Sequence, residues 1–110
     1  MTPKYDWALT YFGGRNPCKD FASTSNIIFS NGKYDPWHGG GVLSDCMVNN
    51  KVILMDKSGH HLDLRTPHDE DPADVKHGRE IEMELITKWI FDYQGKIQID
   101  YGIAEQFVGC

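Results

Sequence analysis

The chain has 110 residues, 40% of them hydrophobic and 12% aromatic, a composition that excludes a disordered chain and predicts one domain at most. Eleven basic against sixteen acidic residues give a net charge of -5 without any lysine or arginine cluster, so no nucleic-acid partner is expected. The apolar stretches are far shorter than the about 20 residues of a membrane span. The start of the chain also lacks a signal peptide pattern, and neither a membrane association nor a secretion signal is expected.

Residues 1–25 mix aromatic side chains with turn formers such as Gly13-Gly14 and Asn16-Pro17. They predict a loop-rich lead-in with one short strand or helix around Trp7 to Phe12.

Three cysteines, Cys18, Cys46 and Cys110, form no Cys-x-x-Cys pair, which excludes a zinc ribbon and a thioredoxin-type redox motif. Their spacing leaves the disulfide partners open, and three free thiols in a reducing compartment are also compatible with it.

Two short apolar runs predict neighbouring strands. Residues 26–30 and 51–55 do not alternate with polar residues, as half-exposed antiparallel strands would, so both are expected to be buried and parallel. The twenty residues between them exclude a tight hairpin and suit the crossover that parallel neighbours require.

A long helix is predicted after Asp71-Pro72, with Asp71 as the N-cap and Pro72 at the first helical position. Gly95 is expected to end it. Its apolar residues form one stripe that should face a sheet, whereas its charged residues should point elsewhere. The stripe consists of Ile81, Leu85, Trp89 and Tyr93, flanked by Ile86 and Ile90, and the outward residues are Lys76, Arg79, Glu80, Glu84 and Lys88.

The predicted fold class is α/β: one partial domain over 1–110, with a lead-in (1–25), a core (26–95) and a tail (96–110). In the tail, Ile97 to Tyr101 alternates like a strand. Parallel α/β sheets hold their ligand sites beyond the carboxyl ends of the strands.

An acid and an imidazole follow the two strands by the same offset. Asp35 comes five positions after the run 27–30, and His60 comes five positions after the run 52–55. Neighbouring parallel strands lie about 4.8 Å apart and their loops leave the same edge. We therefore expect the Asp35 carboxylate within reach of an imidazole nitrogen of His60.

The motifs around this pair resemble the lysosomal Pro-X carboxypeptidase and dipeptidyl peptidase II family of serine peptidases. The resemblance covers roughly residues 2–93 and leaves out the last fifteen or so residues. The motifs that support it are Ser30-Asn-Gly-Lys-Tyr-Asp35-Pro-Trp37, Gly39-Gly-Gly41 and Gly59-His60-His61-Leu-Asp63-Leu-Arg65.

This resemblance implies the C-terminal part of an α/β-hydrolase core with a Ser, Asp, His triad in that chain order. Asp35 then corresponds to the triad aspartate, His60 to the general base, and Trp37 to a wall of the specificity pocket. The family cleaves short peptides next to proline or small residues near a terminus, without a cofactor or a metal. The resemblance also implies a lysosomal or secreted protein and a possible homodimer.

The nucleophile of such a triad is missing from the sequence. No Gly-x-Ser-x-Gly elbow occurs, and every serine in the resembling part lacks the strand, elbow and helix context that exposes a nucleophile. We expect the upstream portion of the same enzyme to supply the serine, and this chain to be inactive alone.

Two alternatives remain open from the sequence. The chain is a truncated, non-catalytic relative that serves as a binding module or does not fold stably, because two strands leave exposed edges. Alternatively it is a metal-dependent hydrolase, although the candidate ligands lack the i, i+4 helical spacing of a zincin. Those candidates are His60, His61, Asp63, His68 and Asp69.

Overall fold

The computed structural model describes the backbone of residues 4–108 and the side chains of residues 4–96. Two compact units are present, Met1–Arg79 and Glu80–Cys110. The elements are the helices α1 (Trp7–Phe12), α2 (Pro17–Asp20) and α3 (Ala73–Val108), the strands β1 (Ile28–Gly32) and β2 (Lys51–Met55), and the 3₁₀ helices η1 (Pro36–Gly40) and η2 (Leu62–Leu64).

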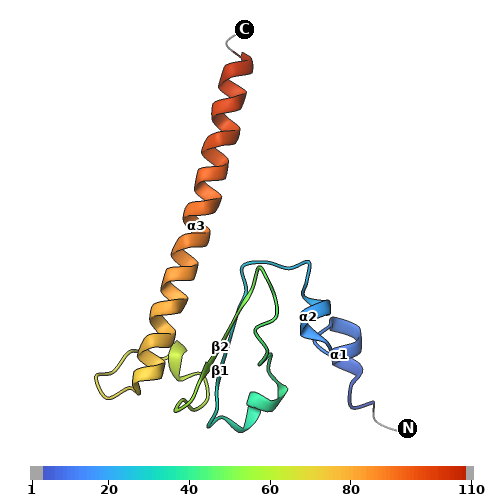
Figure 1. Ribbon diagram of the computed structural model, residues 1–110, viewed down its shortest axis with the longest axis vertical. Helices are drawn as coiled ribbons and strands as arrows, with labels where there is room; N and C mark the ends of the chain where they lie inside the picture. Colours follow the sequence, from blue (N-terminus) through green and yellow to red (C-terminus); the bar gives the residue numbers. More distant parts are fainter. Residues whose placement is uncertain (1–3, 109–110) are drawn as a thin grey trace. The chain divides into compact units, whose positions relative to one another are not determined.

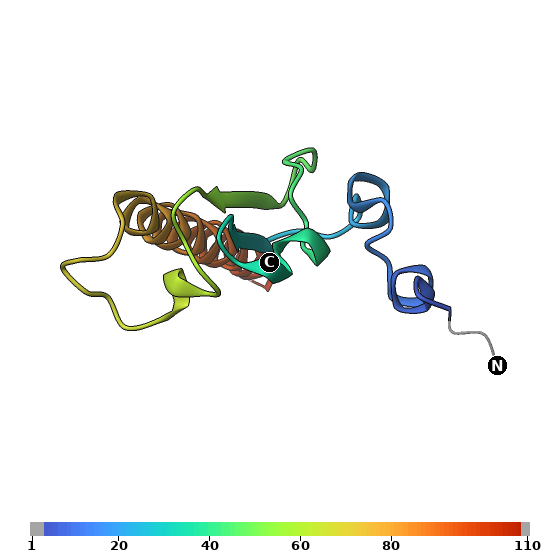
Figure 2. The same ribbon diagram turned by 90° about the horizontal axis from the view of Figure 1, so that it is seen from below.

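The two strands form a parallel sheet, as predicted, with Ile28 beside Lys51 and Gly32 beside Met55. The second strand has the predicted bounds, whereas the first begins two residues later and continues to Gly32. Figure 1 shows both strands ending at the same edge, and Figure 2 shows them side by side from below. Both loops that follow the strands therefore start at one end of the sheet.

The expected complete burial of both strands is wrong. In β1 only Gly32 is buried, and its other residues are partly exposed. In β2 the side chain of Leu54 is also exposed. The physical reason is the size of the sheet: among the described residues it has only two strands, and parallel strands are completely buried only where both faces of the sheet are covered.

A small core lies where β2 meets the first turns of α3. The buried apolar residues are Val52, Ile53, Met55 and Val75, together with Met47, which precedes β2. Gly78 allows a close approach, because a Cβ atom there would lie 2.9 Å from the sulfur of Met55. The start of the helix is thereby held against the second strand.

The lead-in folds as α1 and α2, so the segment Trp7–Phe12 is a helix rather than a strand. A disulfide joins Cys18 to Cys46, which resolves one pairing that the sequence left open, and Cys110 lies outside the described residues. Buried Asn50 accepts a hydrogen bond from the Ile27 N–H (3.2 Å) and donates to the Thr24 hydroxyl (2.9 Å). The segment before β1 is thus fixed to the start of β2.

Helix α3 differs from its prediction at both ends. It begins at Ala73, and the Asp71 carboxylate binds Arg79 and the N–H of His68 instead of capping the first turn. It also continues past Gly95 to Val108, so the expected strand in the tail is wrong. Glycine weakens a helix interior by about 1 kcal/mol without removing a hydrogen-bond donor, and no proline follows to interrupt the helix.

The apolar stripe of α3 is less buried than expected. Ile81, Leu85 and Trp89 are partly exposed, and Ile86, Ile90 and Tyr93 are exposed. In the described part of the chain, no helix is both long enough and apolar enough to cross a membrane.

Candidate active site

The site begins at the paired ends of the two strands. Gly32 and Met55 are register partners, and the backbone N–H of Lys33 donates to the Met55 carbonyl at 2.9 Å. Asp35 and His60 follow within a few residues, so two short loops deliver both side chains from the same edge.

Asp35 is held by the 3₁₀ helix η1 that it caps. One carboxylate oxygen, Oδ1, accepts the N–H of Trp37 at 3.0 Å, and Pro36 fills the first helical position, where no N–H is needed. The Asp35 carbonyl lies 2.5 Å from Nδ1 of His38. The residue is 7% exposed, and the Trp37 hydrogen bond orients its carboxylate.

The second carboxylate oxygen, Oδ2 of Asp35, lies 2.7 Å from Nδ1 of His60. The expected proximity of the two groups is therefore present. The hydrogen bond from His60 is the main reason that the pKa of Asp35 is lowered. It outweighs the desolvation that raises this pKa, and the Trp37 N–H adds to the lowering.

The charge of Asp35 determines which imidazole nitrogen of His60 is the hydrogen-bond donor. An ionised carboxylate only accepts hydrogen bonds, so Nδ1 of His60 is the donor. In the neutral ring Nε2 is then the acceptor nitrogen and is able to take a proton. The His60 side chain is 61% exposed, so this basic nitrogen belongs to an accessible ring.

The loop before His60 packs tightly against the end of β1. Ser58 is completely buried, and its carbonyl accepts the N–H of Tyr34 at 3.0 Å. A Cβ atom at Gly32 would lie only 2.3 Å from this carbonyl oxygen and 2.5 Å from that of Gly59. Only glycine therefore fits at the end of β1 while the His60 loop keeps this position.

The residue that follows His60 has an unusual, left-handed backbone conformation. His61 has a positive φ of 40° and a ring contact with His60, with centroids 4.5 Å apart. Gly59, which precedes His60, does not have a positive φ, although glycine adopts one most readily. The left-handed residue is instead His61, and the two rings touch.

Trp37 lies on η1, the 3₁₀ helix that Asp35 caps. Its backbone N–H holds Asp35, while its side chain is 77% exposed. The role of this indole in a pocket stays a prediction.

Ser58 is the one serine of the sequence that follows β2, but it is fully buried and its hydroxyl donates to the Gly59 carbonyl. It does not present a nucleophile to the imidazole.

The candidate metal ligands do not form a cluster in the described part of the chain. No group of three or more His, Cys, Asp or Glu side chains there is arranged to hold a metal ion. Asp63 is 5% exposed, and its Oδ2 has no hydrogen-bond partner among the described residues.

Sequence reasoning missed two residues that support the site. Gly32 stands directly after an apolar run, and a glycine at a strand end is a recognised signal for close backbone approach. Arg79 was expected on the outward face of α3, but its side chain is 15% exposed and binds the turn that follows His60. Helical periodicity gives no signal for such a contact.

Comparison with known proteins adds the family. Residues 4–82 match the family described as serine carboxypeptidase S28. The chain is 43% identical to the lysosomal Pro-X carboxypeptidase of Mus musculus over 98 residues, which are 89% of this chain and 19% of that protein. Identity to the lysosomal Pro-X carboxypeptidase of Homo sapiens is 40% over 93 residues, 84% of this chain and 18% of that protein.

A third relative is the prolyl carboxy peptidase like protein 5 of Caenorhabditis elegans, 46% identical over 70 residues, which are 62% of this chain and 14% of that protein. The chain thus spans about a fifth or less of the length of these curated relatives. The resemblance inferred from the motifs around Asp35 and His60 is confirmed, and the chain belongs to the serine carboxypeptidase S28 family.

Proposed function

We propose that this chain supplies the aspartate and the histidine of a Ser-Asp-His triad, within an α/β-hydrolase fold that a longer protein completes. The single observation that supports this most directly is the 2.7 Å hydrogen bond between Oδ2 of Asp35 and Nδ1 of His60. Asp35 orients the ring and His60 transfers protons. The serine comes from an upstream portion, because the 110 residues contain no Gly-x-Ser-x-Gly elbow.

The chemistry follows from the protonation states of the pair. A serine hydroxyl is a weak nucleophile until a base takes its proton. Nε2 of His60 is the acceptor nitrogen and would be that base, and Asp35 would stabilise the imidazolium that forms. Nε2 would then give the proton to the leaving amine. The lowered pKa of Asp35, caused mainly by the His60 hydrogen bond, keeps the carboxylate ionised while this happens.

We further propose that the substrates are short peptides cleaved next to proline or a small residue, in a lysosomal or secreted setting. The names of two relatives, lysosomal Pro-X carboxypeptidases, support both the bond type and the compartment. We assign Trp37 to substrate binding, because its indole is exposed and the residue lies only two positions after Asp35 in the chain.

A chimera tests this proposal. The 98 residues that match in the Mus musculus lysosomal Pro-X carboxypeptidase are replaced by the corresponding residues of this chain. Fluorophosphonate labelling of the serine and release of the residue after proline are then measured. We expect both in the chimera, no labelling in His60→Ala, and a loss of roughly 10⁴ in kcat for Asp35→Asn, which leaves the wrong imidazole tautomer.

His68→Ala is the matched control, since His68 is another exposed histidine of the same chain. This variant should be labelled like the chimera. A chimera with a native circular dichroism spectrum that is not labelled, or equal labelling of the His60→Ala variant, would refute the assigned roles.

A further inference from the structure

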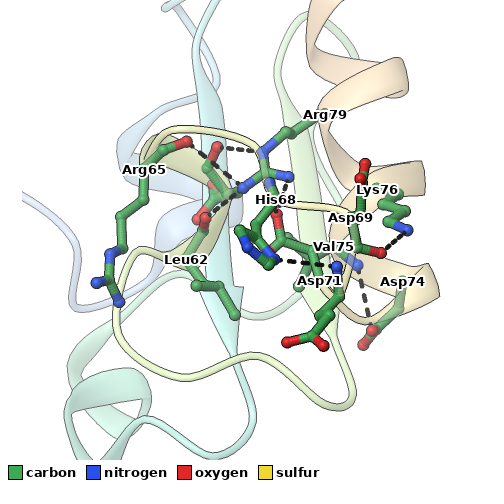
Figure 3. Close-up of polar contacts among 11 residues, drawn as sticks. Leu62, Arg65, His68, Asp69, Asp71, Asp74, Val75, Lys76 and Arg79 are labelled. Atoms are coloured by element: carbon green, nitrogen blue, oxygen red, sulfur yellow. Dashed lines mark hydrogen bonds and ion pairs between the residues drawn. The ribbon is translucent and has the colours of Figure 1, made fainter.

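The turn that follows His60 is held by a largely shielded arginine from α3. Figure 3 shows the Arg79 guanidinium beside the backbone of this turn. Its Nε donates to the Asp63 carbonyl at 2.9 Å, and one terminal nitrogen donates to the Leu62 carbonyl at 2.8 Å and to that of Arg65 at 3.5 Å. Three carbonyl groups within four residues thus accept hydrogen bonds from one planar guanidinium.

The same guanidinium is fixed from its other side by an acid. Its second terminal nitrogen pairs with Oδ2 of Asp71 at 2.6 Å, and that oxygen also accepts the His68 N–H at 2.9 Å. The side chains of Arg79 and Asp71 are 15% and 10% exposed, so both ends of the pair are largely shielded from water. An arginine fork held in this way has little freedom to turn.

The His60 segment is therefore tied at two ends. Before it, the Ser58 carbonyl binds Tyr34, and the Lys57 N–H binds the Asp74 carboxylate on α3 at 2.6 Å. After it, Arg79 binds the carbonyl of Leu62, only two residues beyond His60. Two residues span at most about 7 Å of chain, so a movement of the Leu62 backbone would also move His60.

His60 itself has few contacts of its own. Its side chain is largely exposed, and its described contacts are the hydrogen bond to Asp35 and the ring contact with His61. The exposed ring therefore depends on the two backbone anchors for its position. Gly59, which precedes the ring, adds backbone freedom because it has no Cβ. Left-handed His61, which follows it, has a conformation that persists only where the surrounding structure holds it.

We propose that Arg79 is a positioning residue for His60: paired with Asp71, it fixes the turn Leu62–Leu64 and so keeps the imidazole against the Asp35 carboxylate. This inference rests on the proposed function of His60 as the base, but the position of the ring is measurable without any catalysis.

The test uses the 110-residue chain and the backbone amide of Trp37. This N–H donates to Asp35, so its ¹H–¹⁵N NMR shift follows the protonation of Asp35 as pH falls. The His60→Ala variant gives the largest expected rise in the pKa of Asp35, because it removes the main cause of the lowered pKa. We expect Arg79→Gln to produce more than half of the upward pKa shift seen in His60→Ala.

Two further variants separate positioning from charge and from stability. Lys76→Gln removes one positive charge from the same helix, one turn earlier, and should leave the pKa of Asp35 unchanged. Arg79→Lys keeps the charge but loses the fork, and should give a shift between those of Arg79→Gln and the unsubstituted chain.

Each outcome decides the inference. An unchanged Asp35 titration in folded Arg79→Gln would overturn it, as would equal shifts in Arg79→Gln and Lys76→Gln. Loss of the dispersed amide spectrum in both Arg79 variants, with Lys76→Gln folded, would also overturn it, because Arg79 would then hold the fold and not His60 in particular. Loss of activity in the chimera with a normal titration in the chain would contradict the proposed function alone.

Discussion

The close packing of Gly32 against the His60 loop predicts the effect of Gly32→Ala. The added Cβ would lie 2.3 Å from the Ser58 carbonyl oxygen, whereas ordinary contacts begin at 3.4 Å. The loop would have to move by about 1 Å, the difference between these two distances. Because both neighbours are backbone atoms, no side-chain rotation relieves the clash.

A displacement of this size affects both stability and site. Overpacking costs roughly 1–3 kcal/mol, and loss of the hydrogen bond from Tyr34 to Ser58 adds about 1 kcal/mol. We expect Gly32→Ala to lower the free energy of unfolding by about 2–4 kcal/mol, which corresponds to a Tm lower by roughly 8–16 °C for a chain of this size. The same shift would stretch the 2.7 Å bond between Asp35 and His60 beyond hydrogen-bonding distance.

Gly59→Ala is the matched control for this experiment. Nothing lies within 4 Å of a Cβ at Gly59, and neither glycine has a positive φ, so both substitutions change the entropy of the unfolded chain alike. Thermal and urea denaturation of the two variants therefore isolate the steric effect at Gly32. Equal stabilities would refute the packing argument, and a normal pKa of Asp35 in folded Gly32→Ala would refute its link to the site.

Three further predictions concern stability. Asn50→Ala leaves partly buried backbone groups without this partner and should cost about 1–3 kcal/mol in urea unfolding, whereas an unchanged midpoint would contradict the role of this side chain. Replacing Cys18 and Cys46 by serine opens a loop with a sequence separation of 28 and should cost about 3 kcal/mol by calorimetry; equal Tm values would show that the disulfide adds no stability. The pKa of Asp35 is lowered in the fold, so its contribution to stability is complete above the ordinary Asp pKa of about 4 and is lost as pH falls below it. His60→Ala should therefore flatten the decline in unfolding free energy below pH 4, and an unchanged acid slope would argue against the hydrogen bond as its main cause.

The parts of the fold that sequence predicted are those that local patterns encode. The run Val52 to Met55 is bounded by polar residues, and its strand has the expected limits. The proximity of Asp35 and His60 follows from one geometric rule, that parallel strands end at the same edge, and it needed no knowledge of the side-chain packing.

The parts that sequence missed depend on contacts distant in the chain or on weak stop signals. Arg79 is polar, so periodicity assigns it to the outer face of a helix, yet the carbonyls of a turn 14 to 17 residues away surround it. Gly95 is a common C-cap, but a glycine ends a helix only where the chain turns after it, and here the helix continues. Three cysteines allow three pairings, and only the three-dimensional structure distinguishes them.

The crossover between β1 and β2 separates Asp35 from His60 in the sequence, but it does not determine the distance between them in space. Asp35 precedes most of this segment and His60 follows β2, so the pair is spaced by the strand register and by two short loops. At Gly39 and Gly40 the crossover has open space around it. Added side chains at these two positions would therefore meet no neighbour, and the acid and the imidazole would stay in register.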